Sequence, residues 1–297
     1  MAEKHIHKAG FVNIIGNPNV GKSTLMNALV GERLSIITSK SQTTRHRIMG
    51  IVNGDDYQIV YSDTPGILKP SYRLQESMMD FVDGAIGDAD IILYVTDTVE
   101  SPQKHKEYIE KLTRVESPVI LVLNKIDIST QEKVAELVAL WRSMIPKAEI
   151  FAVSALEKFN LDSVFEKILE LLPQNPAWYD KDTLTDRNLR FFASEIIREK
   201  ILTNYTKEIP YCCEVVVEEF REGDEKYEIS AVINCMRDSQ KGILIGKKGA
   251  ALKKVGIEAR LDMEAFFEKK VVLHLFVKVN PDWREDKRKL KSFGYIQ

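Results

Sequence analysis

Short apolar runs recur through the first 172 residues, separated by longer stretches with apolar residues near helical spacing. Such runs are typical of buried strands, and the stretches between them are typical of amphipathic helices. The predicted strands are residues 11–15, 48–52, 57–62, 91–95, 119–123 and 149–153. The predicted helices begin near Leu25 and at Ser101–Pro102, and include residues 74–86, 134–141 and 161–172. This alternation predicts an α/β fold with a mostly parallel sheet covered on both faces, and Asn53–Gly54–Asp55 predicts one local antiparallel hairpin.

A segment with two prolines, residues 173–179, breaks this pattern, and the order of elements changes beyond it. The predicted elements are helix 187–202, strands 214–220 and 227–235, a glycine-interrupted helical stretch 242–255, helix 258–267, and strand 271–277. This α-β-β-α-α-β order predicts a separate, smaller α+β domain. We therefore expect an N-terminal domain over residues 1–175, a linker over 176–186 and a C-terminal domain over 187–297.

Composition and charge narrow the class of protein. The chain of 297 residues is long enough for two domains, and it has no apolar run of membrane-spanning length. The first eight residues lack the apolar core of a signal peptide, so we expect a cytoplasmic protein. The three cysteines include no C-x-x-C pair, which favours reduced, packed thiols. The net charge of −2 hides an asymmetry, because the segment from Arg237 onward holds 15 lysines and arginines against 8 acidic residues. Such a basic segment indicates a polyanionic partner.

The first strand leads directly into a phosphate-binding P-loop motif. The pattern G-x-x-x-x-G-K-S/T is matched by Gly16, Asn17, Pro18, Asn19, Val20, Gly21, Lys22 and Ser23, and Thr24 follows. The two glycines permit the backbone path, while backbone N–H groups and the following helix N-terminus supply partial positive charge. Lys22 can reach the β- and γ-phosphates, and the Ser23 hydroxyl can bind Mg²⁺. The alternative is a glycine-rich turn that matches the motif by chance. Such a turn would have to match all four fixed positions and also lie between a predicted strand and a predicted helix.

A D-x-x-G segment, Asp63 to Gly66, ends the third predicted strand. The Asp63 carboxylate can bind a Mg²⁺-linked water, as the second acidic element of P-loop enzymes does. The Gly66 N–H can face a γ-phosphate, and glycine gives the following loop a pivot. A plain turn is the alternative, but the position at a strand end after the P-loop favours function.

Two further strand ends carry residues suited to guanine. The Asp127 carboxylate can accept from both N1–H and the exocyclic amine of guanine, and adenine offers no such pair of donors. Asn124 can tie the loop together, and the stem of Lys125 can cover the base. Ser154–Ala155 can offer a backbone N–H to the guanine O6. Each segment could be a polar turn, but together they predict GTP as the ligand.

These motifs, with the segment Ser41-Gln42-Thr43-Thr44-Arg45-His46-Arg47, resemble those of translation-factor-like GTPases and, more closely, of the Era family of ribosome-associated GTPases. The resemblance extends over nearly the whole chain. It implies a GTP-hydrolysing switch in which a threonine binds Mg²⁺ together with Ser23 and Asp63. Thr44 is our choice for that threonine, and Thr43 is the alternative.

The resemblance also implies slow basal turnover. Ile67 stands where Ras-like enzymes carry the glutamine that orients water, and its side chain cannot do so. Relatives with such a hydrophobic residue use K⁺, held partly by the asparagine that matches Asn19, and K⁺ is our hypothesis here. Arg45 is a candidate arginine finger in cis, but a solvated loop arginine is the favoured alternative for it. The residues expected to serve hydrolysis are Lys22, Asn19, Thr44 and Gly66.

The C-terminal domain carries a G-x-x-G turn between two apolar triplets. Such a turn lets helix ends approach a nucleic-acid backbone, and the α-β-β-α-α-β order around it resembles a type II KH domain, which clamps about four nucleotides. The candidate RNA-binding residues are Lys241, Ile243, Ile245, Gly246, Lys247, Lys248, Gly249 and Lys253. For the two isoleucines, core packing is an equal alternative to lining an RNA groove. The basic, aromatic tail over residues 283–295 either contacts RNA or docks its rings on this domain.

The resemblance implies a target, which is single-stranded RNA near the 3′ end of small-subunit ribosomal RNA, and a role in small ribosomal subunit assembly. We expect a monomer that binds GTP or GDP with Mg²⁺. One rival is a P-loop kinase or ATPase, which Asn124, Lys125 and Asp127 disfavour, and another is a scaffold that binds GTP without hydrolysing it. Peripheral membrane association through the basic tail is a third possibility, for which the sequence offers no convincing amphipathic pattern.

Overall fold

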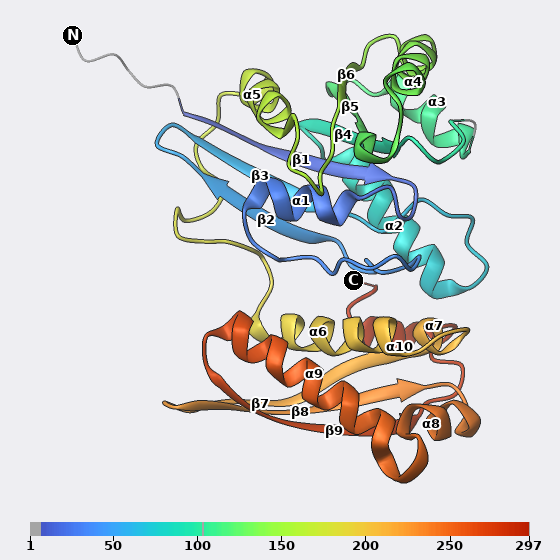
Figure 1. The fold of residues 1–297 in the computed structure, drawn as a ribbon. Helices are drawn as coiled ribbons and strands as arrows, with labels where there is room; N and C mark the ends of the chain where they lie inside the picture. Colours follow the sequence, from blue (N-terminus) through green and yellow to red (C-terminus); the bar gives the residue numbers. More distant parts are fainter. Residues whose placement is uncertain (1–6, 103, 297) are drawn as a thin grey trace. The chain divides into compact units, whose positions relative to one another are not determined.

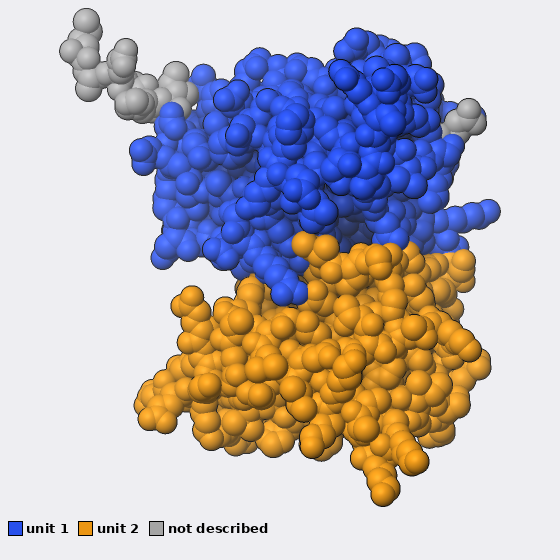
Figure 2. Space-filling model, viewed as in Figure 1, with its two compact units in different colours: residues 1–35, 44–70, 78–186 blue, residues 36–43, 71–77, 187–297 orange. Residues whose placement is uncertain are grey.

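The computed structural model describes residues 7–102 and 104–296. The chain forms two compact units, which are coloured separately in Figure 2. Unit 1 comprises residues 1–35, 44–70 and 78–186, and unit 2 comprises residues 36–43, 71–77 and 187–297. Unit 2 thus includes two short segments that lie within the N-terminal domain predicted over residues 1–175.

Unit 1 is built on a six-stranded sheet with helices on both sides (Figure 1). Its strands are β1 (Lys8–Gly16), β2 (Ile48–Asn53), β3 (Tyr57–Asp63), β4 (Ile91–Asp97), β5 (Val119–Asn124) and β6 (Glu149–Ala152). Its helices are α1 (Lys22–Val30), α2 (Arg73–Gly87), α3 (Lys106–Arg114), η1 (Ile126–Ile128), α4 (Gln131–Met144) and α5 (Leu161–Leu171), and the first turn of α2 clusters with unit 2. The strand order is β2-β3-β1-β4-β5-β6, and only the β2–β3 pair is antiparallel. The predicted α/β fold with one local hairpin is confirmed.

The parallel strands bring several polar residues to one edge of the sheet. All residues of β4 and β5 are buried, because a parallel strand inside a doubly covered sheet has apolar neighbours on both faces. The register pairs Ile14 with Asp63 and Gly16 with Val95, and it pairs Asp97 with Asn124. The carboxyl ends of β1, β3, β4 and β5 therefore meet, and ligands of open α/β sheets bind at such an edge.

One predicted helix start is wrong. Ser101–Pro102 was expected to open a helix, but α3 begins at Lys106. His105, the residue directly before α3, has φ of 52° and ψ of 53°. A right-handed helix that began at residues 101–102 could not continue through this left-handed conformation, so α3 begins only after it.

Unit 2 has helices on one face of a three-stranded sheet (Figure 1). Its elements are α6 (Leu189–Asn204), α7 (Ile209–Cys212), β7 (Glu214–Glu222), β8 (Lys226–Cys235), α8 (Asp238–Ile245), η2 (Lys247–Gly249), α9 (Ala250–Phe267), β9 (Lys270–Val279) and α10 (Lys287–Ser292). The central strand β8 pairs with β7 antiparallel and with β9 parallel. The core comprises one face of each main helix and of β8, including Ile197, Ile201, Ile229, Ile233, Val255 and Met263. Among the described residues of both units, no helix has the length and apolarity needed to span a bilayer.

The predicted glycine interruption within residues 242–255 lies at the turn Gly246–Gly249, which separates α8 from α9. The predicted division between residues 255 and 258 is wrong, because α9 runs unbroken from Ala250 to Phe267. The break between α8 and α9 follows from backbone conformation, since Gly246 and Gly249 have φ of 70° and 78°. Glycine adopts such angles at little steric cost, and a helix cannot continue through them.

Candidate functional site

The P-loop joins the end of β1 to the N-terminus of α1. Gly16 and Gly21 have φ of 151° and 97°, a conformation that favours glycine. A Cβ on Gly16 would lie 2.1 Å from the Val95 carbonyl oxygen, and one on Gly21 would lie 2.2 Å from Asn124 Nδ2. No side chain caps the N-terminus of α1, so the backbone N–H groups of its first turn suit an anion.

Lys22 lies under this loop with only 6% of its surface exposed. Its Nζ donates to the Asn17 carbonyl oxygen at 2.9 Å. Burial lowers the pKa of Lys22 to about 8, and the nearby carboxylates of Asp63 and Glu100 oppose that shift. A phosphate anion beside Nζ would favour the charged ammonium.

Three oxygen-bearing side chains meet beside Lys22. Ser23 Oγ donates to Asp63 Oδ2 at 2.6 Å, Thr44 Oγ1 donates to the same atom at 3.2 Å, and the two hydroxyls are 2.9 Å apart. Asp63 Oδ1 is buried without a hydrogen-bond partner in the described structure, and burial is the main cause that raises the pKa of this carboxyl. Mg²⁺ prefers hard oxygen ligands and keeps several waters, so this group fits that ion.

The geometry favours Thr44 over Thr43 as the switch threonine. Thr43 Oγ1 lies 2.7 Å from both the Lys40 carbonyl oxygen and Thr38 Oγ1, away from Asp63. Thr44 alone of the two reaches Asp63 and Ser23.

The D-x-x-G segment packs directly against the P-loop. A Cβ on Gly66 would lie 2.7 Å from Pro18 Cα, so the close approach requires glycine. The Ile67 N–H donates to the Gly16 carbonyl oxygen at 3.0 Å, and the Ile67 side chain is fully buried. Position 67 therefore presents no polar group that could orient a water.

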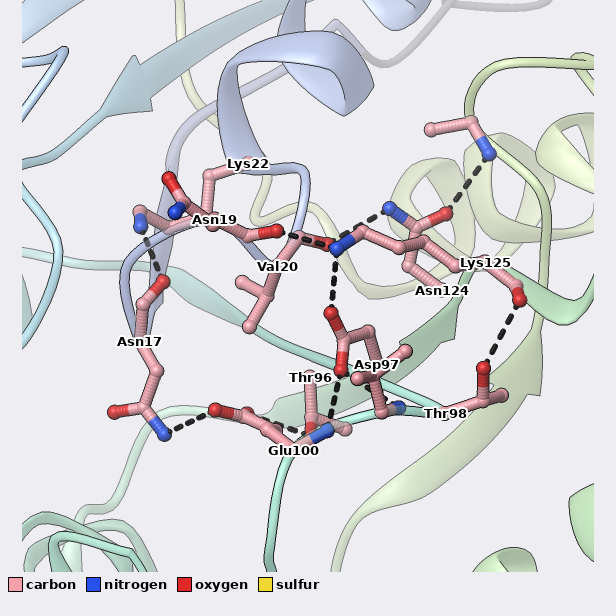
Figure 3. A network of polar contacts seen from close by, with 12 residues as sticks. Asn17, Asn19, Val20, Lys22, Thr96, Asp97, Thr98, Glu100, Asn124 and Lys125 are labelled. Atoms are coloured by element: carbon pink, nitrogen blue, oxygen red, sulfur yellow. Dashed lines mark hydrogen bonds and ion pairs between the residues drawn. The ribbon is translucent and has the colours of Figure 1, made fainter. Parts of the chain in front are cut away.

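Two of the residues expected at guanine, Asn124 and Lys125, also bind the P-loop (Figure 3). Asn124 Nδ2 donates to the Val20 carbonyl oxygen at 2.9 Å. Lys125 Nζ donates to the Asn19 carbonyl oxygen at 2.5 Å and pairs with Asp97 Oδ2 at 2.6 Å. Asp127 lies on η1 with its side chain exposed, so its carboxylate is accessible to a guanine base.

The Ser154–Ala155 segment is also fixed, but in a way that the sequence did not predict. The Ala155 N–H, expected to face the guanine O6, donates to Asn124 Oδ1 at 2.9 Å. Ser154 is buried, and its Oγ accepts from the Glu157 N–H at 3.2 Å. Asn124 therefore joins the P-loop to this loop with both ends of its amide.

Two acidic residues of this network were not predicted. Asp97 orients Lys125, and Glu100 accepts from Asn17 Nδ2 at 2.6 Å and from Thr96 Oγ1 at 2.9 Å (Figure 3). The sequence feature that could have predicted them is their position at the carboxyl end of β4, because ligands of open α/β sheets bind at that edge.

In unit 2 the predicted turn presents its two lysines to solvent. Lys247 and Lys248 are exposed, whereas Lys241 is partly buried on α8. A Cβ on Gly246 would lie 2.7 Å from the Ala251 Cβ, so glycine lets α8 and α9 meet tightly. The arrangement offers positive charge at a turn whose backbone is accessible.

A groove beside this turn runs between α9 and β9. It is lined by Gly249, Leu252, Lys253, Gly256, Ile257, Arg260, Leu273 and Leu275. Lys253 was predicted, but Ile243 and Ile245 are not among the lining residues, and Ile243 on α8 is half exposed. Gly256 within α9 was the missed signal, because a helical glycine often marks a close approach.

The aromatic residues of the tail dock on unit 2. Trp283 is fully buried, and its Nε1 donates to the Cys212 carbonyl oxygen at 3.0 Å. Tyr295 is buried and donates to Glu214 Oε2 at 2.8 Å. Of the two alternatives, docking accounts for these rings, and they cannot stack on nucleic acid from these positions.

Comparison with known proteins extends the similarity to the whole chain. Residues 11–125 match the family described as 50S ribosome-binding GTPase, and residues 208–284 match the KH domain family. A protein named GTPase Era from Geotalea daltonii is 44% identical over 297 residues, which are 99% of this chain and 100% of the relative. GTPase Era from Syntrophus aciditrophicus is 45% identical over 293 residues, which are 97% and 95% of the two chains.

Two solved structures superpose on nearly the whole chain, each with a TM-score of 0.93 and coverage of 98% of this chain and 100% of the other. One is an Era variant from Aquifex aeolicus bound to GDP and AlF₄⁻, at 39% sequence identity. The other is Era in complex with MgGDPNP and nucleotides 1506–1542 of 16S ribosomal RNA, at 38% identity.

Proposed function

The chain belongs to the Era family of GTPases, and from this premise we propose that it is a switch that binds the 3′ region of small-subunit ribosomal RNA and assists assembly of the small ribosomal subunit. The observation that carries the proposal is its full-length likeness to an Era protein in complex with MgGDPNP and nucleotides 1506–1542 of 16S ribosomal RNA. Unit 2 has suitable chemistry for such a ligand, with two exposed lysines on a glycine turn beside an apolar groove. Because one chain carries both proposed sites, we propose a monomer, and a ribosomal target would place it in the cytoplasm.

The residues of unit 1 divide the recognition of GTP between them. The N–H groups of the P-loop and Lys22 hold the β- and γ-phosphates, and Asp127 selects guanine. Ser23 and Thr44, with Asp63 through a water, would hold Mg²⁺, which neutralises charge on the β/γ-phosphate oxygens. Loss of the γ-phosphate releases Thr44 and the segment after Gly66, as in other GTPase switches.

Potassium is expected to accelerate hydrolysis, since Ile67 is buried and cannot orient water. We predict faster single-turnover hydrolysis in KCl than in NaCl, and loss of this difference in Asn19→Ala and Asn19→Gly. The two variants control for backbone strain, because Asn19 has φ of 65°. Alanine loses roughly 1–2 kcal/mol in that conformation and glycine does not. Equal rates in both salts for the unmodified protein would rule out the potassium hypothesis.

Lys247 and Lys248 are expected to contact RNA phosphates. The double variant K247A/K248A should bind a single-stranded RNA of the proposed target more weakly, with a flatter dependence of log Kd on log salt. The slope should fall by about 1.4, since each phosphate contact on a single strand contributes about 0.7. The matched control is K133A/K147A, which removes two exposed lysines of unit 1. An unchanged slope for K247A/K248A would place the RNA elsewhere.

Crosslinking tests the proposed target directly. The full chain is crosslinked to small ribosomal subunits with a GTP analogue or with GDP, and the RNA positions are mapped. We expect crosslinks near the 3′ end of the small-subunit RNA, more abundant with the GTP analogue. Depletion in the host should lower the ratio of small to large subunits. Crosslinks confined to other regions would refute the target, and an unchanged subunit ratio would refute the assembly role.

A further inference from the structure

The segment of residues 36–43, which precedes Thr44, is held by the end of a helix of unit 2. Lys40 Nζ donates to the carbonyl oxygens of Leu202 and Tyr205, at the C-terminus of α6. A cation is favourable there, because the last carbonyls of a helix carry partial negative charge and lack partners within the helix. Lys40 therefore ties the segment to the end of α6.

The same helix end is joined to the G-x-x-G turn by a buried hydrogen bond. Tyr205, the C-terminal cap of α6, is only 8% exposed, and its hydroxyl donates to the Leu244 carbonyl oxygen at 2.6 Å. Leu244 lies in the last turn of α8, two residues before Gly246. The hydroxyl is protonated at neutral pH and can donate, and burial raises the pKa of Tyr205 further, to about 12.

At its other end the segment is fixed directly beside the proposed Mg²⁺ ligand. Thr43 Oγ1 donates to the Lys40 carbonyl oxygen at 2.7 Å, and the Thr43 carbonyl oxygen accepts from Arg198 of α6. Arg198 is buried and paired with Glu195 at 2.6 Å. Thr44 is the next residue in the chain, so any displacement of Thr44 on GTP binding or hydrolysis acts on this hydrogen-bonded segment.

We propose that Lys40 and Tyr205 couple the nucleotide state at Thr44 to the RNA-binding turn at Gly246–Gly249. In the GTP state, Thr44 bound beside the nucleotide keeps residues 36–43 ordered and Lys40 on the α6 C-terminus. On hydrolysis the segment loosens, Lys40 leaves the Tyr205 carbonyl, and the Tyr205 hydroxyl no longer holds the end of α8 in its RNA-competent position. The two-state element is the order of residues 36–43, and linkage requires RNA to favour GTP by the same factor. This inference rests on the proposed function.

The test measures this coupling in the full chain. The Kd for a single-stranded RNA with the 3′ sequence of small-subunit ribosomal RNA is determined with GDP and with a Mg²⁺-bound GTP analogue. The ratio of the two values is the coupling factor, and roughly 5–150 is typical of coupled sites. We expect Lys40→Met and Tyr205→Phe to bring the ratio to about one while nucleotide affinity without RNA stays within about twofold. Lys40→Arg should preserve the ratio, and so should Lys207→Met, which removes an exposed lysine just beyond α6.

The outcomes separate the inference from the proposed function. A ratio of one in the unmodified protein would refute the coupled switch itself. An unmodified protein that couples, with K40M and Y205F coupling equally well, would refute the roles of Lys40 and Tyr205 alone. An equal loss of RNA affinity in both nucleotide states for Y205F would show that Tyr205 only supports the turn, and would also overturn the inference.

Discussion

Replacing Asp127 by asparagine is expected to change the preferred nucleotide from GTP to XTP. The carboxylate would accept from two donors of guanine, whereas an amide offers one acceptor and one donor. Xanthine carries a carbonyl where guanine carries the exocyclic amine, so it matches the amide. Two charge-assisted hydrogen bonds of roughly 1.5–3 kcal/mol each correspond to a loss of about 10²- to 10⁴-fold in GTP affinity.

The structure indicates that this change will act on the base alone. Asp127 is exposed, and the network that fixes its loop consists of Asn124, Lys125 and Asp97 and does not include its carboxylate. The measurement is Kd and single-turnover hydrolysis for GTP, XTP and ATP, with Asp55→Asn as a control at an exposed aspartate of the β2–β3 turn. Hydrolysis of ATP by the unmodified protein that Asp127→Asn leaves unchanged would revive the kinase or ATPase alternative.

Most of the fold was predictable because its signals are local. The alternation of apolar runs with helical periodicity predicted the strands of unit 1 and the fold class of unit 2. Each predicted nucleotide-binding motif lies at the end of one of these strands. The errors arose where a backbone angle, or its absence, overrides the pattern. His105, with φ of 52°, keeps a helix from continuing from Ser101–Pro102 into α3, and α9 runs unbroken past residues 255–258, where a division was predicted.

The candidate site was predictable only where its residues form a spaced motif. Ser23 and Asp63 meet because the sheet register brings two strand ends together, and each residue belongs to a known sequence motif. Lys40 and Tyr205 belong to no such motif. They are more than 160 residues apart in the chain, and their contact depends on how α6 packs. Long-range contacts of this kind leave no periodic signal in one sequence.

Replacing Lys22 is expected to have the largest effect on hydrolysis. Its ammonium is the buried cation next to Asn17 that the phosphates would meet. Removal of one such preorganised donor costs about 10²–10³ in rate, so Lys22→Met should lose at least that much in the rate constant for hydrolysis of bound GTP. The measurement is single-turnover hydrolysis at saturating protein. A loss below about tenfold would show that other groups carry the phosphate charge.

The pH dependence of nucleotide binding gives a second, independent readout of the same residue. In the nucleotide-free protein burial lowers the pKa of Lys22 to about 8 from an ordinary 10.5. The unfolded chain therefore binds more protons between these values, and this group makes folding more favourable as pH rises through that window. Nucleotide binding should show the opposite sign, because only the ammonium pairs with phosphate, and GDP affinity should fall about tenfold between pH 7 and 9. Lys22→Arg keeps its charge, so its affinity should change only through deprotonation of the guanine N1–H. Parallel pH profiles for the two proteins would show that Lys22 stays charged before the nucleotide arrives.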